Sequence, residues 1–210
     1  MINLLIVDDH TIFRAGLVRL LEEERSIGSV TEATDAHSAL ELVREESFDV
    51  VLLDINLPVK SGLELLPALK DVAPRLPVIM LSMYSAEQYA LRAYEAGASA
   101  YVSKDMDAEV LMAAIRKVAS GGRYITPDIA EQMLRKIDAV PGESPHLQLS
   151  AREFEVMTRI ASGVSLTSIA HELHLSVKTV STYRTRLLTK LGLDGNAELV
   201  RYALQHRLID

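Results

Sequence analysis

The sequence predicts an α/β doubly wound sheet of five parallel strands, followed by a small all-α domain of four helices. Three observations lead to this prediction. Short apolar runs alternate with helical patterns through the first 120 residues, polar residues follow the apolar runs, and residues 150–210 contain no strand pattern. A length of 210 residues is sufficient for two domains that each bury a core.

Short apolar runs predict the strands of the sheet. They cover residues 4–7, 50–53, 78–81 and 100–102, and a weaker strand is predicted near residues 29–33. The four strong runs are apolar on both faces, as expected for parallel strands that helices cover on both sides. Right-handed crossovers would place helices on both faces of the sheet.

Apolar residues at helical spacing predict the connecting helices, as where Phe13, Leu17 and Leu21 share one face. The five predicted helices of this domain cover residues 12–24, 36–46, 62–72, 86–96 and 107–119.

Turn-forming residues divide the chain into two domains. Ser120-Gly121-Gly122 ends the first, and Pro141-Gly142-Glu143-Ser144-Pro145 has the composition of a linker. A further helix is predicted between them at residues 127–138, with Pro127 in its first turn. The predicted organisation is a first domain (residues 1–122), a linker (residues 123–146) and a helical domain (residues 147–210).

The charge is unevenly distributed along the chain. Residues 1–125 contain 12 Lys and Arg against 19 Asp and Glu, whereas residues 147–210 contain 8 against 6. The overall net charge of −7 therefore does not exclude a nucleic-acid partner for the C-terminal domain.

The composition excludes several classes of protein. The chain has no cysteine, which rules out disulfides, thiolate metal sites and cysteine catalysis. No apolar run approaches the roughly 20 residues of a membrane helix. The N-terminus carries acids where a signal peptide would carry basic residues. We therefore expect a cytoplasmic protein with no membrane partner.

Polar side chains at the strand ends form the first candidate site. In a doubly wound sheet the carboxyl ends of the strands meet in one crevice. The residues that follow the predicted strands are Asp8, Asp9, Asp54, Ser82 and Lys104. Carboxylates gathered there suit Mg2+, which prefers oxygen ligands. Together with a lysine and a hydroxyl, they suit a transferred phosphoryl group. His10 is expected to face solvent, because Mg2+ prefers oxygen to nitrogen.

These residues, in this order, resemble a bacterial response-regulator receiver domain, which has a flavodoxin-like fold. The motifs that carry the resemblance are Asp8-Asp9, Asp54-Ile55-Asn56-Leu57-Pro58, Ser82 and Lys104. The resemblance implies that Asp54 accepts a phosphoryl group from a histidine kinase. It implies that Asp9, Asp54 and the backbone carbonyl of Asn56 ligate Mg2+, and that Asp8 contributes to the same site largely through water. It also implies that Lys104 binds the phosphoryl group and that Ser82 and Tyr101 form a switch pair.

The helix predicted at residues 177–190 forms the second candidate site. Ser176 suits its N-cap, and a short helix at residues 166–173 precedes it across a tight turn, as in a helix-turn-helix. Residues 177–191 contain Lys178, Arg184, Arg186 and Lys190 but no acid. A basic, hydroxyl-rich helix in an acidic protein indicates contact with DNA.

This region resembles a LuxR-type helix-turn-helix, so the whole chain is similar to the NarL/FixJ family of response regulators. The motifs include Ile169-Ala170-His171-Glu172-Leu173 and Lys190-Leu191-Gly192-Leu193, and Ser181-Thr182-Tyr183-Arg184 resembles the GacA/UvrY branch. The resemblance implies that Ser181, Thr182 and Thr185 face base edges in double-stranded DNA. It implies that Lys178, Arg184 and Lys190 hold phosphates. The last helix would pair two copies of the chain through Leu199, Val200 and Ala203, or would only complete the core of its domain.

The expected function is that of a two-component response regulator, a transcription regulator and not an enzyme. Phosphorylation of Asp54 would switch homodimerisation and sequence-specific DNA binding, with RNA polymerase as a further partner. One alternative is a constitutive DNA-binding transcription factor whose receiver serves only for dimerisation. Another is a phosphatase of the haloacid-dehalogenase type, which would need a second acid where this chain has Asn56.

Overall fold

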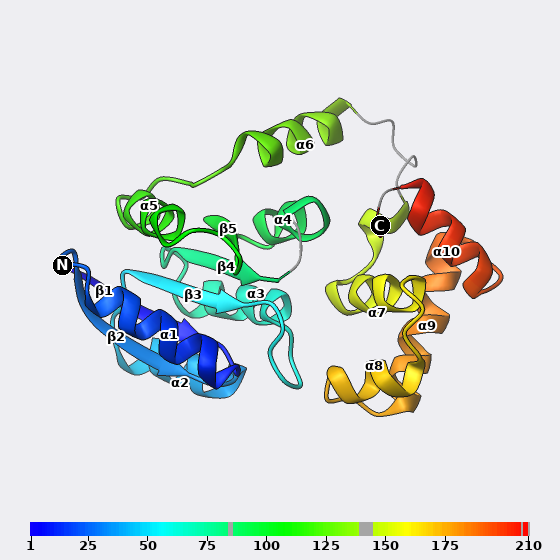
Figure 1. Cartoon of the computed structure of the whole chain (residues 1–210), viewed down its shortest axis with the longest axis horizontal. Helices are drawn as coiled ribbons and strands as arrows, with labels where there is room; N and C mark the ends of the chain where they lie inside the picture. The colour runs from blue at the N-terminus through cyan, green and yellow to red at the C-terminus, as the bar shows by residue number, and fades with distance from the viewer. Residues whose placement is uncertain (84–85, 139–144, 207, 210) are drawn as a thin grey trace. The chain divides into compact units, whose positions relative to one another are not determined.

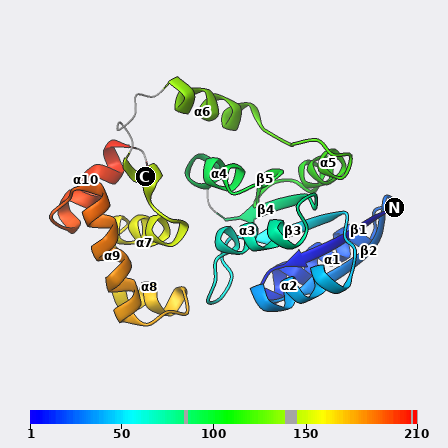
Figure 2. The same ribbon diagram turned by 180° about the vertical axis from the view of Figure 1, so that it is seen from behind.

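The computed structural model describes residues 1–83, 86–138, 145–206 and 208–209. The chain folds into two compact units, Met1–Ile137 and Asp138–Asp210 (Figures 1 and 2). No helix in the described part of the chain has both the length and the apolar character needed to cross a bilayer.

The first unit is built on a parallel sheet of five strands in the order β2-β1-β3-β4-β5 (Figure 1). The strands are β1 (Ile2–Val7), β2 (Ile27–Ala33), β3 (Val50–Asp54), β4 (Val78–Ser82) and β5 (Ala100–Ser103). Every residue of β3 and β4 is buried, which is why these runs are apolar on both faces. The predicted doubly wound sheet is confirmed, including its weaker strand.

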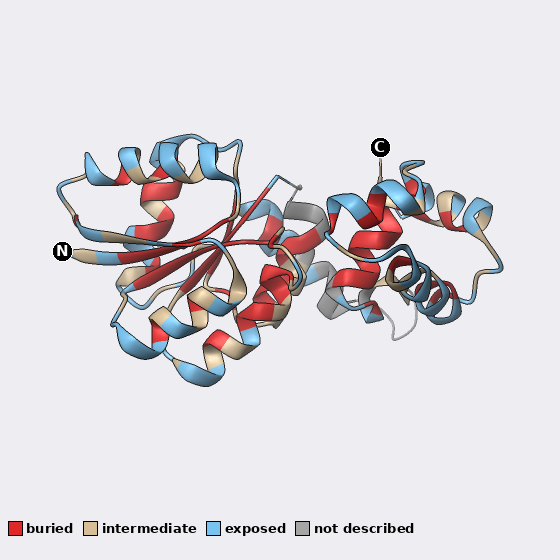
Figure 3. Ribbon diagram, turned by 90° about the horizontal axis from the view of Figure 1, so that it is seen from below, coloured by how far each residue is buried: buried red, intermediate tan, exposed pale blue. Residues whose placement is uncertain are grey.

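Helices cover both faces of this sheet (Figure 3). Leu17 and Leu21 of α1 and Ile115 and Val118 of α5 pack in one core with alternate residues of the strands. The helices of the unit are α1 (Thr11–Glu22), α2 (Ala36–Glu45), α3 (Gly62–Val72), α4 (Ala86–Glu95), α5 (Ala108–Ala119) and α6 (Pro127–Asp138). α1 ends two residues before its predicted end, at Glu22.

The segment after α5 continues to pack on the sheet. The backbone N–H of Tyr124 donates to the carbonyl of Ser99, and the hydroxyl of Tyr94 donates to the carbonyl of Tyr124. Ile129 of α6 is buried. The first part of the predicted linker thus belongs to the first unit, and residues 139–144 of that linker lie outside the described residues.

The second unit consists of helices. They are the short 3-10 turn η1 (Pro145–Gln148), α7 (Ala151–Ala161), α8 (Leu166–Glu172), α9 (Val177–Leu191) and α10 (Asn196–Gln205). His174 has a φ of 51° in the tight turn between α8 and α9, and the Ser176 side chain accepts the N–H of Thr179 as the predicted N-cap. Gly192 ends α9 with a φ of 66°, a conformation that favours glycine. The four main helices and the helix-turn-helix are as predicted.

Candidate functional site

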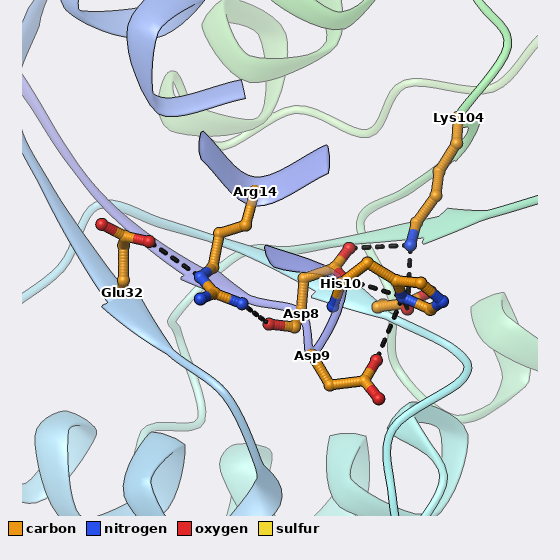
Figure 4. A network of polar contacts seen from close by, with 7 residues as sticks. Asp8, Asp9, His10, Arg14, Glu32 and Lys104 are labelled. Carbon is orange, nitrogen blue, oxygen red and sulfur yellow. Dashed lines mark hydrogen bonds and ion pairs between the residues drawn. The ribbon is translucent and has the colours of Figure 1, made fainter. Parts of the chain in front are cut away.

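Three carboxylates meet at the carboxyl end of the sheet (Figure 4). Asp8 and Asp9 follow β1, and Asp54 is the last residue of β3. One oxygen from each, together with Nδ1 of His10, lies within 4.8 Å of all the others. The side chains of Asp8 and Asp54 are almost completely buried, whereas that of Asp9 is 28% exposed. The sequence therefore predicted which acids the fold would bring together.

Lys104 supplies the positive charge of this cluster. Its ammonium lies 2.7 Å from Asp8 Oδ2 and 2.8 Å from Asp54 Oδ2, and 4.5 Å from the centre of the Phe13 ring. The lysine side chain is 4% exposed, so these interactions are screened little by water. Burial raises the pKa of Asp54 above its usual value. The Lys104 ammonium opposes this shift, and the carboxylate of Asp8 adds to it.

The predicted switch pair comes from β4 and β5. Ser82 ends β4 and Tyr101 lies on β5, and both side chains are buried. The backbone N–H of Lys104 donates to the carbonyl of Ser82 over 2.7 Å, which links the lysine to the serine. The structure therefore buries the side chains of both predicted switch residues.

The loop after Asp54 is strained and tightly packed. Val59 has a φ of 66°, and the N–H of Lys60 donates to the carbonyl of Pro58, as in a γ-turn around Val59. At Gly62, a Cβ would lie 2.0 Å from the carbonyl oxygen of Asp54. Only glycine therefore allows α3 to begin against the peptide that carries Asp54.

Two residues beside the cluster were not predicted to contact it. Nη1 of Arg14 donates to the carbonyl of Asp8 over 2.6 Å, while its Nε pairs with Glu32 (Figure 4). The side chain of His10 is 58% exposed, as expected of a residue that faces solvent, yet its Nδ1 lies 3.0 Å from Asp9 Oδ1. Sequence spacing alone could not reveal either contact, because both depend on side-chain direction.

The donor atoms fit a hard divalent cation such as Mg2+. Carboxylate oxygens are its preferred ligands, and the buried Oδ1 atoms of Asp54 and Asn56 have no hydrogen-bond partner among the described residues. A cation at this position would supply charge for a phosphoryl group, and Lys104 would supply a second positive charge.

Helix α9 exposes the residues that were predicted to face DNA. Lys178, Ser181, Thr182 and Thr185 are exposed, while Val180 and Leu187 of the opposite face are buried in the core. The hydroxyls of Thr182 and Thr185 each donate to the backbone carbonyl four residues earlier. Tyr183 and Arg186, which were not assigned a role, line a shallow groove with Lys178.

Two of the residues predicted to contact phosphate, Lys190 and Arg184, form interactions within their own unit. Nζ of Lys190 lies 2.6 Å from Glu153 Oε2, and Nε of Arg184 donates to Asn196 Oδ1 over 2.7 Å. Glu153 belongs to α7, so Lys190 connects the basic helix to the helix behind it.

The burial of two of the predicted pairing residues favours the alternative in which α10 completes the core of its domain. Leu199 and Ala203 are completely buried in the core of their own unit, where α10 packs on α7. They therefore cannot present side chains to a second copy of the chain in this conformation. Val200 is partly exposed and Leu204 is 51% exposed, so α10 still presents apolar side chains on its surface.

Comparison with known families agrees with this division of the chain. Residues 4–116 match the family described as response regulator receiver domain, and residues 147–203 match bacterial regulatory proteins of the luxR family. Response regulator UvrY of Escherichia coli (strain K12) is 39% identical over 209 residues, which are 99% of this chain and 96% of UvrY. The chain belongs to the response regulators. Response regulator GacA of Pseudomonas aeruginosa is 36% identical over 211 residues, with 100% and 99% of the two chains covered.

Solved structures place this response regulator among DNA-binding relatives. RcsB from Salmonella enterica serovar Typhimurium, bound to the promoter rprA in the presence of the phosphomimetic BeF3−, is 26% identical to it. The TM-score is 0.62, and the alignment covers 96% of this chain and 98% of RcsB. The response regulator thus joins a receiver to a LuxR-type DNA-binding domain, in the branch that contains UvrY and GacA.

Proposed function

We propose that Asp54 is the phosphoacceptor of this response regulator and receives its phosphoryl group from a histidine kinase. The observation that carries the proposal is the position of Lys104 Nζ, 2.8 Å from the buried Asp54 carboxylate and 2.7 Å from Asp8. A carboxylate oxygen of Asp54 would attack phosphorus while the bond from phosphorus to the kinase imidazole breaks, which leaves an acyl phosphate. Asp8, Asp9, Asp54 and the backbone carbonyl of Asn56 would hold Mg2+, which neutralises the phosphoryl oxygens.

The phosphoryl group would act on the second unit through Lys104, Ser82 and Tyr101. New negative charge at Asp54 attracts the ammonium of Lys104 and the hydroxyl of Ser82. Ser82 and Tyr101 would respond together to this charge and alter the exposed surface beside β5. We propose that this change promotes homodimers and sequence-specific binding to double-stranded DNA in the cytoplasm, where RNA polymerase would be the further partner.

Helix α9 is proposed as the recognition helix. The exposed side chains of Ser181, Thr182 and Thr185 suit base edges in the major groove. Lys178, Arg184 and Lys190 suit phosphates, for which the last two would exchange their present partners. Val200 and Leu204 of α10 would carry the contact between two copies, and the domain boundaries at residues 122 and 147 would delimit the two functions.

Intact mass after incubation with acetyl phosphate and Mg2+ tests the acceptor. We expect one phosphoryl adduct on the unaltered chain and on the control Asp105→Asn, which changes an exposed acid next to Lys104. We expect no adduct on Asp54→Asn. An adduct that persists on Asp54→Asn would contradict the assignment.

DNA binding tests the output. Duplexes selected from a random pool with the phosphorylated chain would serve as probes in fluorescence anisotropy. We expect at least a tenfold lower Kd after phosphorylation. An unchanged Kd would instead support a constitutive DNA-binding protein whose receiver serves only for dimerisation.

A further inference from the structure

We propose that Nδ1 of His10 is a direct ligand of the divalent cation in the acidic cluster, and that it shifts the preference of this site from Mg2+ toward first-row transition-metal ions. The inference rests on the proposed function, because it concerns the cation held beside Asp54. It adds a nitrogen ligand to a site for which the family resemblance implies oxygen ligands alone.

The position of Nδ1 is that of a ligand beside other ligands of one ion. It lies 3.1 Å from Asp8 Oδ1, 3.0 Å from Asp9 Oδ1 and 3.5 Å from Asp54 Oδ2. Ligands at about 2.1 Å from an octahedral ion lie about 3.0 Å from their neighbours and about 4.2 Å from the opposite ligand. One donor atom from each of the four residues lies within 4.8 Å of the donor atoms of the other three.

The backbone holds the ring in this position. The N–H of His10 donates to Asp8 Oδ1 over 2.7 Å, which fixes the start of the side chain beside the cluster. His10 is also the N-cap residue of α1, where Ser, Thr, Asp or Asn would usually cap the helix. Among the described residues its side chain makes no capping hydrogen bond, so the ring is available to the cluster.

Nδ1 of His10 is within hydrogen-bond distance of Asp8 Oδ1, at 3.1 Å, and a bound cation would also account for the two further carboxylate oxygens beside it. A single Nδ1–H can be directed at one acceptor, whereas Nδ1 of His10 faces oxygens of three different carboxylates. His37 provides the contrast within the same unit, because its Nε2 lies 3.3 Å from Glu41 in an ordinary pair along one helix. The His10 side chain is also 58% exposed, so a hydrated ion can reach the site past the ring.

The chemistry of imidazole determines the expected preference. Neutral imidazole binds first-row transition-metal ions well, whereas Mg2+ favours oxygen and retains its water. Replacement of one water by Nδ1 would thus favour Mn2+ and the later ions over Mg2+. The carboxylates would bind either kind of ion, so removal of the ring should change the selectivity more than the occupancy of the site.

Mn2+ is the probe for the test, because its unpaired electrons report on coordinated nitrogen. Pulsed electron paramagnetic resonance of the full chain with Mn2+ should detect a nitrogen coupling. The coupling should be absent in His10→Ala and in His10→Asn, whose amide oxygen can occupy the place of Nδ1. The matched control His37→Asn, which alters an exposed histidine beside a carboxylate, should keep the coupling.

Affinities provide a second readout. The signal of free Mn2+ gives its Kd, and competition gives that of Mg2+. We expect His10→Ala to raise the Kd of Mn2+ about tenfold and that of Mg2+ less than about threefold.

Two results would overturn the inference. One is an unaltered chain that binds Mn2+ without a nitrogen coupling. The other is His10→Ala with tighter binding of both ions, which would mean that the ring only competes with the cation. The mass of the acetyl phosphate adduct separates these results from failure of the proposed function. An adduct without nitrogen coupling refutes the His10 ligand alone, whereas no adduct and no Mn2+ binding refute the phosphoacceptor site as well.

Discussion

Lys190 of the basic helix α9 places its ammonium 2.6 Å from Glu153 Oε2 on α7. The side chain of Glu153 is 4% exposed, and the same oxygen accepts the backbone N–H of Ser150 in the capping box of α7. The cation of Lys190 therefore stabilises the fold of the DNA-binding domain as well as contributing to its positive surface.

Lys190→Ala should separate these two contributions. It leaves a buried carboxylate without its cation, so we expect a loss of about 1–2 kcal/mol in the stability of the DNA-binding domain, an estimate that allows for partial exposure of the lysine. Lys178→Ala, at an exposed position of the same helix, should change stability by less than about 0.5 kcal/mol. Thermal unfolding measures both, and equal melting temperatures for the two variants would contradict the structural role of Lys190.

The same carboxylate should make the DNA-binding domain sensitive to acid. Burial alone raises the pKa of Glu153, but hydrogen bonds from Lys190 and Ser150 outweigh burial and hold the pKa below its usual 4.5. The folded chain therefore binds this proton less tightly than the unfolded chain. Its contribution to stability is complete above pH 4.5 and is lost as the pH falls through the lowered pKa. Chemical unfolding between pH 3 and 7 should show this loss of stability in the unaltered chain and a weaker loss in Glu153→Gln. Parallel profiles of stability against pH for the two chains would contradict the role of Glu153.

Asp54→Asn should stabilise the unphosphorylated receiver at neutral pH. Burial raises the pKa of Asp54 above its usual 3.8, with Lys104 opposing the shift and Asp8 adding to it. A raised pKa means that the contribution of this group to stability is complete below pH 3.8 and is lost as the pH rises through the folded value. We therefore expect Asp54→Asn to raise the Tm of the receiver by a few degrees at neutral pH, and by less as the pH approaches 3.8.

Scanning calorimetry from neutral pH down to pH 3.8 measures the change in Tm caused by Asp54→Asn. Asp71→Asn, which changes an exposed acid on α3, is the matched control and should leave the Tm nearly unchanged. A Tm of Asp54→Asn below that of the unaltered chain at neutral pH would show that the attraction of Lys104 exceeds the effect of burial.

Val59→Gly should also stabilise the receiver. Val59 is 77% exposed and holds a φ of 66°, a conformation that raises the energy of a residue with a Cβ by about 1–2 kcal/mol. Glycine removes this strain but increases the entropy of the unfolded chain, so the net gain should be about 0.5–1 kcal/mol. Denaturant unfolding measures this gain in the free energy of unfolding. Val59→Ala keeps a Cβ and should gain less, and a less stable glycine variant would be incompatible with strain at this position.

The sequence predicted the backbone of this protein well, because its signals are local. The runs at residues 50–53 and 78–81 are apolar on both faces, and the structure buries every residue of the strands they form. The polar residues after them then meet at one edge of the sheet, since parallel strands share that edge. Asp8, Asp54 and Lys104 could thus be grouped from the sequence alone.

Side-chain partners were less predictable, because packing between elements selects them. Nothing in a helical pattern indicates that Lys190, whose side chain is 41% exposed, pairs with Glu153 of α7. The apolar spacing of α10 likewise could not show that Leu199 and Ala203 are buried in the core of their own unit. The direction of the His10 ring depends on one rotamer, which composition and periodicity do not encode.

Gly62 illustrates how sterics can restrict evolution at a residue that takes no part in the chemistry. A Cβ there would lie 2.0 Å from the carbonyl oxygen of Asp54, whereas a Cβ at Gly16 of α1 would meet nothing within 4 Å. The space at Gly16 therefore admits an alanine, and we expect that substitution to be tolerated. The same change at Gly62 would displace the peptide that carries the acceptor, so purifying selection should remove it as efficiently as a change of Asp54 itself.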